Sequence, residues 1–136
     1  MPTSVVLDSY ALLAFLEQEP GHEVVGDLLR QTSERGLRLG TPMVNMGEVW
    51  YRYARLRSDE KADQAVARLR GLGVEVIAID WPLTRQAAAY KKSGGLSFAD
   101  CYAAAVAKAW NAALVTGDPE FKRLEKEVEI RWLRRK

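Results

Sequence analysis

The sequence predicts an α/β fold, specifically a three-layer α/β/α sandwich built on a five-stranded parallel sheet. Short apolar runs alternate with stretches of helical periodicity along the chain, and this alternation is typical of parallel sheets covered by helices on both faces. The run at residues 74–79 is apolar almost throughout, as expected for a strand buried on both sides. No repeat, linker or low-complexity segment interrupts the pattern, so we expect a single domain spanning residues 1–136.

Five strands and seven helices are expected, in alternating groups. The predicted strands are residues 5–7, 37–40, 74–79, 113–116 and 129–133. The predicted helices are residues 10–17, 23–35, 41–57, 58–70, 81–92, 97–111 and 119–127. A basic tail, Arg134-Arg135-Lys136, follows the last strand.

Glycine, proline and capping residues set the limits of the helices in the first half. Pro20-Gly21 ends the first helix and Gly36 the second, since glycine commonly closes a helix. Thr41-Pro42 predicts the start of the third helix, with threonine as the cap and proline at the first helical position.

The same signals divide the second half. Gly71 ends the fourth helix before the third strand. Trp81-Pro82 starts the fifth helix, and Ser93-Gly94-Gly95 breaks it ahead of an alanine-rich sixth helix. Pro119 stands at the first position of the last, short helix.

Composition limits the chemistry that this chain can perform. His22 is the only histidine and Cys101 the only cysteine, which argues against a histidine-ligated zinc site and rules out an internal disulfide. Acid–base and metal chemistry therefore fall mostly to carboxylates. No apolar run approaches the ~20 residues of a membrane span, and the N-terminus does not resemble a signal peptide. We expect a cytoplasmic protein that does not contact a membrane.

The net charge of +2 hides an uneven distribution if some acids are sequestered. With four acids set aside in a metal site, 14 of the 18 acidic residues remain against 20 basic ones, which leaves about +6 on the rest of the molecule. A basic surface around an acidic pit suits a polyanion held by its backbone. For any single basic residue, a solvated helix face is the favoured explanation, and only the aggregate charge supports a polyanion.

Four acidic residues are expected to converge at one edge of the sheet. Asp8 and Asp118 follow predicted strands, Asp100 opens the alanine-rich helix, and Glu48 lies about two turns into the third helix. In open α/β sheets, ligands bind outside the carboxyl ends of the strands. Carboxylates gathered there repel one another unless a cation neutralises them, and oxygen-only ligation suits Mg²⁺ or Mn²⁺. The pattern predicts one or two such ions.

Each acid also has a simpler structural explanation. Asp8 and Asp118 stand where helix N-caps stand, and Ser97 with Asp100 has the spacing of a capping box. Glu48 is equally consistent with an exposed glutamate on a helix. Because a helix N-terminus also favours negative groups, capping and metal binding are compatible.

Four segments around these acids resemble the signatures of PIN-domain ribonucleases, and more narrowly of VapC-type toxins. The segments are Val5-Val6-Leu7-Asp8-Ser9, Asn45-Met46-Gly47-Glu48-Val49, Leu96-Ser97-Phe98-Ala99-Asp100 and Leu114-Val115-Thr116-Gly117-Asp118-Pro119-Glu120-Phe121. They occur in the family's order and spacing over nearly the whole chain. Each one alone is a weak signal, and all four in register are a strong one.

The resemblance implies a sheet of order 3-2-1-4-5 and metal-dependent endonucleolytic cleavage of RNA. It implies that Asp8, Glu48, Asp100 and Asp118 are the acidic metal-site residues, with Thr116 beside the site. It also implies a homodimer and a small VapB-type antitoxin that blocks the site and, with the toxin, binds operator DNA.

The predicted mechanism is phosphodiester hydrolysis by a metal-activated water, with Asp8 bridging two ions if two are bound. Glu120 is interpreted as a favourable charge in a helix's first turn, with an accessory role in the site as the alternative. Two other functions stay open at this point. One is a housekeeping RNA-processing nuclease of the same family, and the other is a PIN-like module that binds protein or RNA without cleaving.

Overall fold

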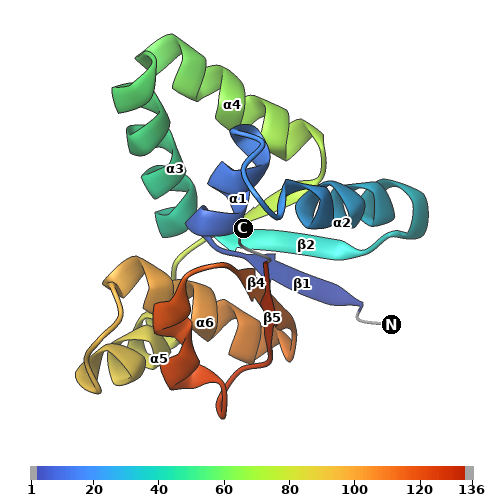
Figure 1. The fold of residues 1–136 in the computed structure, drawn as a ribbon. Coiled ribbons are helices and arrows are strands. Elements are labelled where there is room, and N and C mark those ends of the chain that lie inside the picture. The colour runs from blue at the N-terminus through green and yellow to red at the C-terminus, as the bar shows by residue number, and fades with distance from the viewer. Residues whose placement is uncertain (1–2, 134–136) are drawn as a thin grey trace.

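The central sheet is fully parallel and has the order expected from the family resemblance. The computed structural model describes residues 3–133. Its strands are β1 (Ser4–Leu7), β2 (Arg38–Pro42), β3 (Val74–Ile77), β4 (Ala113–Thr116) and β5 (Ile130–Trp132). They pair in the order β3-β2-β1-β4-β5 (Figure 1). The first strand therefore lies at the centre, between β2 and β4.

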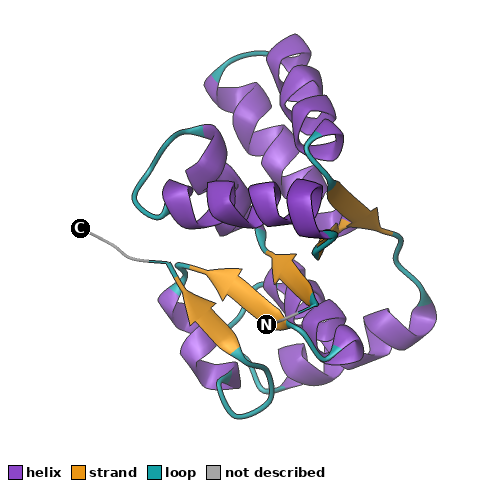
Figure 2. Ribbon diagram, turned by 90° about the vertical axis from the view of Figure 1, so that its right-hand side faces the viewer, coloured by secondary structure: helices purple, strands orange, loops and turns teal. Residues whose placement is uncertain are grey.

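Helices cover both faces of this sheet, which confirms the three-layer α/β/α sandwich (Figures 1 and 2). The helices are α1 (Ser9–Leu16), α2 (His22–Arg35), α3 (Met43–Leu56), α4 (Asp59–Gly71), α5 (Trp81–Lys92), α6 (Phe98–Trp110) and the short 3₁₀ helix η1 (Pro119–Leu124). One core lies between the sheet and α1–α4, and the other between the sheet and α5, α6 and η1.

Strand β1 contributes to both cores because successive side chains of a strand point to opposite faces. Val5 and Leu7 pack into the core beneath α1 and α2, while Val6 packs into the core beneath α5 and α6. All three are fully buried. This double burial is what a near-continuous apolar run predicts for a central parallel strand.

The prediction that Thr41-Pro42 starts the third helix is wrong. Both residues belong to β2, where Thr41 is paired with Val76 and Pro42 with Ile77, and α3 begins at Met43. Pro42 takes the cap position with no side-chain cap hydrogen bond. Pairing with β3 extends the strand by two residues, so tertiary contacts override a local capping signal here.

Other predicted boundaries shift by a few residues. Strand β3 ends at Ile77 instead of residue 79, and Asp80 caps α5 by accepting a hydrogen bond from the Leu83 amide. The expected helix 119–127 is the shorter 3₁₀ helix η1. The basic tail, residues 134–136, lies outside the described residues. No helix in the described range 3–133 is long and apolar enough to cross a membrane.

Gly40 leaves room for a side chain of α6 to lie against strand β2. A methyl group at this position would lie 2.6 Å from the Trp110 ring of α6 and 3.2 Å from the carbonyl oxygen of Glu75. The same ring also packs against Arg38, whose guanidinium carbon is 3.8 Å from the ring centroid. Neither neighbour has room to move aside cheaply.

We expect Gly40→Ala to lower the free energy of unfolding by about 1–3 kcal/mol, the usual cost of overpacking a core. Gly47→Ala is the matched control, because nothing lies within 4 Å of a methyl group there and the position is inside α3. That change should raise stability by up to about 1 kcal/mol through helix propensity. Urea denaturation of both variants measures the difference, and equal stabilities would contradict the close packing.

Candidate metal centre

Asp8 lies at the centre of the carboxyl edge, where β1 passes into α1. Its Oδ1 accepts a hydrogen bond of 2.9 Å from the Ala11 amide, so it caps α1 as one sequence interpretation proposed. Its Oδ2 accepts a bond of 2.5 Å from the Thr116 hydroxyl at the end of β4. Leu7 of β1 is paired with Val115 of β4, so the residues that follow them, Asp8 and Thr116, are also neighbours. The side chains of Asp8 and Thr116 are fully buried.

Asp118 is linked to Asp8 through Thr116. The Asp118 amide donates to the Thr116 hydroxyl oxygen at 3.0 Å, and the Asp118 carboxylate accepts from the Glu120 amide at 3.0 Å, which caps η1. Thr116 therefore donates to one acid and accepts from the backbone of the other. The sequence placed Thr116 beside the site, and the structure puts it between two of the predicted acids.

Asp100, Asp118 and Glu120 form a group with the spacing of a metal site. One carboxylate oxygen from each lies within 4.8 Å of the others. Asp100 stands in the first turn of α6, where its amide donates to the Ser97 hydroxyl at 3.1 Å. Glu120 does stand in the first turn of η1, and it also belongs to this group of acids. Capping and convergence therefore occur in the same residues.

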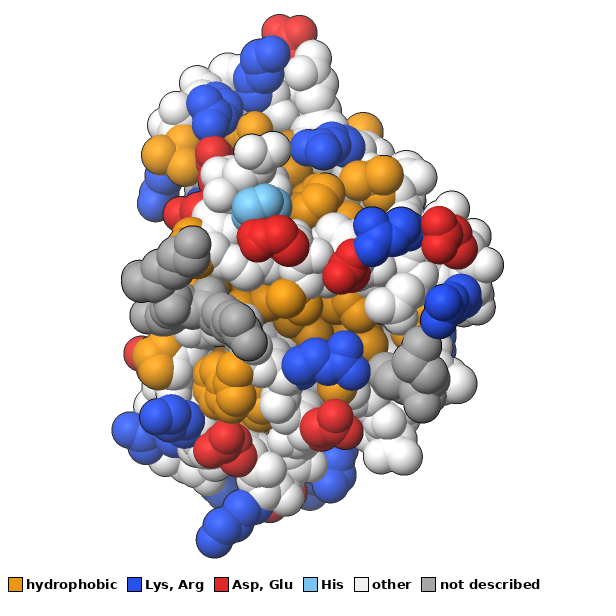
Figure 3. All heavy atoms as spheres, turned by 45° about the vertical axis from the view of Figure 1, so that its right-hand side comes forward, with side chains coloured by type: hydrophobic (Ala, Val, Ile, Leu, Met, Phe, Trp, Pro, Cys, Tyr) orange, Lys and Arg blue, Asp and Glu red, His pale blue; other side chains and the backbone are white. Residues whose placement is uncertain are grey.

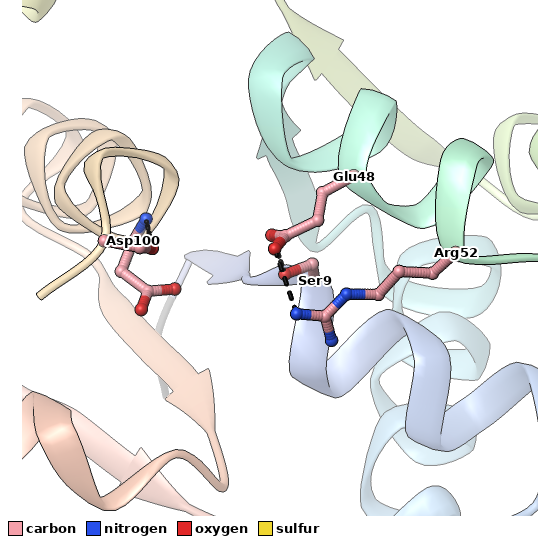
Figure 4. A network of polar contacts seen from close by, with 5 residues as sticks. Ser9, Glu48, Arg52 and Asp100 are labelled. Carbon is pink, nitrogen blue, oxygen red and sulfur yellow. Dashed lines mark hydrogen bonds and ion pairs between the residues drawn. The ribbon is translucent and has the colours of Figure 1, made fainter.

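Glu48 approaches from α3, on the other side of the site (Figure 4). Its Oε1 accepts a hydrogen bond of 2.5 Å from the Ser9 hydroxyl, and its Oε2 pairs with Arg52 at 3.2 Å. The side chain is 13% exposed, so it does not extend into bulk solvent. Glu48 and Asp100 point toward one another from opposite sides of the site (Figure 4), and the Glu48 charge adds a little to the rise in the pKa of Asp100, which is caused mainly by burial. The structure thus brings all four predicted acids to one edge of the sheet.

Burial and mutual repulsion raise the pKa of two of these acids. The pKa of Asp8 is raised to about 7, chiefly by burial, with smaller contributions from Asp100 and Asp118, against the hydrogen bonds from Thr116 and Ala11. The pKa of Asp100 is raised to about 6, again chiefly by burial and also by Asp118, Glu48 and Glu120. A bound cation would oppose both effects, because it favours the charged carboxylates.

The donor set fits a hard divalent cation. Asp100, Asp118 and Glu120 offer convergent carboxylate oxygens, and Asp8 and Glu48 offer two more at the same edge. Mg²⁺ and Mn²⁺ prefer such oxygen ligands. Cys101 does not add a soft ligand: it is buried, and burial raises the pKa of its thiol to about 11. Its side chain packs in the core between the sheet and α5, α6 and η1.

Three residues near these acids were given no role from the sequence, although Ser9 and Asn45 lie within the motif segments. Ser9 and Arg52 hold the Glu48 carboxylate. Asn45, one turn before Glu48 on α3, is fully buried, and neither polar atom of its side chain has a partner within residues 3–133. An asparagine next to the apolar Met46 and Val49 was the one available signal for such a group.

The wider surface does not form one basic field on the face shown in Figure 3. Over the described part of that face, Lys and Arg side chains are interspersed with Asp and Glu, and apolar side chains lie between them.

Comparisons with known proteins agree with this architecture. The PIN domain family model matches residues 5–127, which confirms the resemblance inferred from the four motifs. A search of curated proteins found no match. Among solved structures, the chain is similar to VapBC2 from Rickettsia felis bound to a DNA fragment from their promoter, with a TM-score of 0.74, 17% identity, and coverage of 96% of this chain and 99% of that one.

Two further structures are similar over nearly the same span. DNA-bound VapBC from Salmonella typhimurium gives a TM-score of 0.71 with 19% identity, covering 94% of this chain and 96% of that one. VapC20 from Mycobacterium tuberculosis, a toxin that cleaves the sarcin-ricin loop, gives 0.70 with 21% identity, covering 93% and 98%. At these identities the likeness shows a shared fold.

The raised pKa of Asp8 predicts a pH-dependent effect of Asp8→Asn on stability. Because the pKa in the folded state lies near 7 and the ordinary value is 3.8, the unfolded chain releases this proton first, and the wild type loses stability as the pH rises between these values. In chelator, Asp8→Asn should raise the free energy of unfolding by about 1–3 kcal/mol at pH 8, where the charge is removed. At pH 4.5 it should lower stability by about 1 kcal/mol, because the amide cannot accept both hydrogen bonds.

Urea denaturation at the two pH values measures this reversal. Asp80→Asn is the matched control, since Asp80 is also a helix cap but is exposed and lies outside the group of acids. Its effect should be small and equal at both pH values. The same pH-independent result for Asp8→Asn would contradict a strained buried carboxylate.

Divalent cation should stabilise the folded protein by relieving this repulsion. At a Mn²⁺ concentration of about 100 times its dissociation constant, linkage predicts a gain of about 2.7 kcal/mol, seen as a rise in melting temperature that chelator reverses. The Asp100→Asn/Asp118→Asn double variant should lose the rise, whereas Asp80→Asn should retain it. An unchanged rise in the double variant would place the ion elsewhere.

Proposed function

Because this chain belongs to the PIN-domain family, we propose that it is a metal-dependent endoribonuclease that cleaves RNA phosphodiester bonds. The observation that carries the proposal is the convergence of Asp8, Glu48, Asp100, Asp118 and Glu120 at the carboxyl edge of the sheet. Carboxylates that repel one another lower the stability of the fold when no cation is bound. The same repulsion favours the binding of a cation.

The residues of the site have separable roles in this proposal. Asp100, Asp118 and Glu120 would hold Mg²⁺ or Mn²⁺ on one side, and Glu48 would close the site from α3. Asp8 would contribute a carboxylate from the centre of the site. A bound divalent ion supplies charge neutralisation and acidifies a water for attack at neutral pH. No side chain needs to attack phosphorus, so the absence of a nearby histidine is no obstacle.

Hydrogen bonds orient these acids before any ion arrives. Thr116 fixes the Asp8 carboxylate and also the start of the Asp118 turn. Ser9 fixes one oxygen of Glu48. Each carboxylate oxygen has a second lone pair, so these bonds leave capacity for a ligand. Groups that hold ligands in this way commonly affect metal affinity or activity 10–100-fold, and we assign Thr116 and Ser9 to that role.

We further propose that the chain is the toxin of a toxin–antitoxin pair in the cytoplasm. Its structural neighbours include VapBC complexes from Rickettsia felis and Salmonella typhimurium, both bound to DNA. By that likeness, the partner is a VapB-type antitoxin, operator DNA is bound only through the antitoxin, and the toxin is a homodimer. Growth arrest on expression, relieved by co-expression of a small antitoxin encoded beside the gene, distinguishes this role from housekeeping RNA processing.

Cleavage of total RNA in Mg²⁺ or Mn²⁺, with mapping of the cut ends, tests the nuclease activity. Asp8→Asn should reduce the rate by at least about 100-fold, because it removes a charge from the candidate metal centre. The variant should remain folded, so the loss cannot be assigned to unfolding. Asp80→Asn should cut at the wild-type rate. Cleavage that survives chelator, or full activity in Asp8→Asn, would overturn the proposed mechanism.

A further inference from the structure

Arg52 stands at the mouth of the candidate metal centre, one helical turn beyond Glu48 on α3 (Figure 4). Its Nη2 donates to Glu48 Oε2 at 3.2 Å. The arginine side chain is 52% exposed, whereas that of Glu48 is 13% exposed. The pair therefore runs from the interior of the site to its rim, with the positive charge on the solvent side.

The Arg52 guanidinium is distinguished by its ion pair with an acid of the candidate metal centre. Within residues 3–133, it is the one cationic side chain that forms an ion pair with any of Asp8, Glu48, Asp100, Asp118 and Glu120. An RNA phosphate that approaches five carboxylates meets repulsion from all of them. A bound divalent ion offsets part of this charge, and Arg52 is the protein's own positive group at the same place.

Glu48 does not depend on Arg52 for its position. The Ser9 hydroxyl already holds Oε1 of Glu48 at 2.5 Å, from a side chain that is 5% exposed. An ion pair at this i,i+4 helical spacing contributes only about 0.3–0.5 kcal/mol to stability when its cation is exposed, as Arg52 is. The hydrogen bond to Glu48 is made by Nη2 alone, and a guanidinium has five N–H donors in a planar fork. Arg52 can thus bind a second anion while it keeps its contact with Glu48.

We infer that Arg52 binds a backbone phosphate of the RNA strand beside the scissile bond, a role that rests on the proposed nuclease function. The guanidinium fork matches phosphate oxygens in a bidentate geometry that a lysine cannot reproduce. Contact with the backbone carries no base information. Arg52 is accordingly a substrate-binding residue that sets the position of the strand at the acids, without selecting its sequence.

The test measures binding separately from cleavage. Fluorescence anisotropy with a labelled single-stranded RNA oligonucleotide, in Mg²⁺ and in an Asp8→Asn background that does not cut, gives the dissociation constant as a function of salt. Arg52→Gln should weaken binding about 10-fold at moderate salt, which corresponds to the loss of a charge-assisted hydrogen bond. It should also reduce the slope of log affinity against log salt by about 0.7, the value for one phosphate contact on a single strand.

Two variants serve as controls. Arg52→Lys keeps the charge, so the salt slope should return while affinity recovers only in part. Arg55→Gln removes the same charge from the same helix, at a guanidinium that lies 5.1 Å from the Tyr51 ring, and should leave the slope unchanged. The melting temperature of Arg52→Gln should stay within about 2 °C of its parent, as expected for loss of an exposed pair.

The outcomes separate this inference from the proposed function. If the wild type cleaves RNA and Arg52→Gln binds like its parent with an unchanged slope, the inference is wrong and the nuclease stands. If Arg52→Gln and Arg55→Gln weaken binding equally, the effect is one of net charge and the inference is again wrong. If Arg52 alone controls binding and the wild type does not cleave, the RNA contact stands and the nuclease proposal fails.

Discussion

The parallel pairing of β1 between β2 and β4 is the constraint on which the rest of this molecule depends. It buries Val5, Val6 and Leu7 completely, so the chain emerges from the sheet at one fixed point. The next residue, Asp8, has no access to solvent there and meets Thr116 from the neighbouring strand. The sheet thus fixes the position of the Asp8 carboxylate. The packing of the two cores offsets the free-energy cost of burying it.

Helix capping reconciles these acids with a stable fold. Asp8 caps α1 and Asp118 caps η1, while Asp100 sits in the first turn of α6. Negative groups are favourable at helix N-termini, which lowers the cost of each acid taken singly. Burial raises this cost again, and the nearby acids add to it, as the elevated pKa values of Asp8 and Asp100 indicate. The balance of the two effects leaves a folded protein whose group of acids is compatible with a divalent cation.

Much of this architecture could be predicted from the sequence because its signals are local. The apolar runs, Gly36 at the end of α2 and the Asp80 cap of α5 follow from patterns within a few residues. The prediction that Thr41-Pro42 starts a helix was wrong for the same reason, because it relied on a local pattern. The pair has the local pattern of a helix start, yet pairing with Val76 and Ile77 keeps it in β2. The spacing of Glu48 and Arg52 is itself local, but the position of Arg52 at the rim of the site depends on how α3 packs against the sheet.

The sequence by itself determined the class of fold, the order of its elements and the identity of the acids near the strand ends. Periodicity and capping chemistry are properties of neighbouring residues, so they can be read along the chain. Only the tertiary structure decided that Glu120 joins Asp100 and Asp118, that Ser9 orients Glu48 and that Arg52 lies at the rim. Ser9 and Glu48 are 39 residues apart, and contact over such a separation is set by how helices pack on a sheet, which no local pattern specifies.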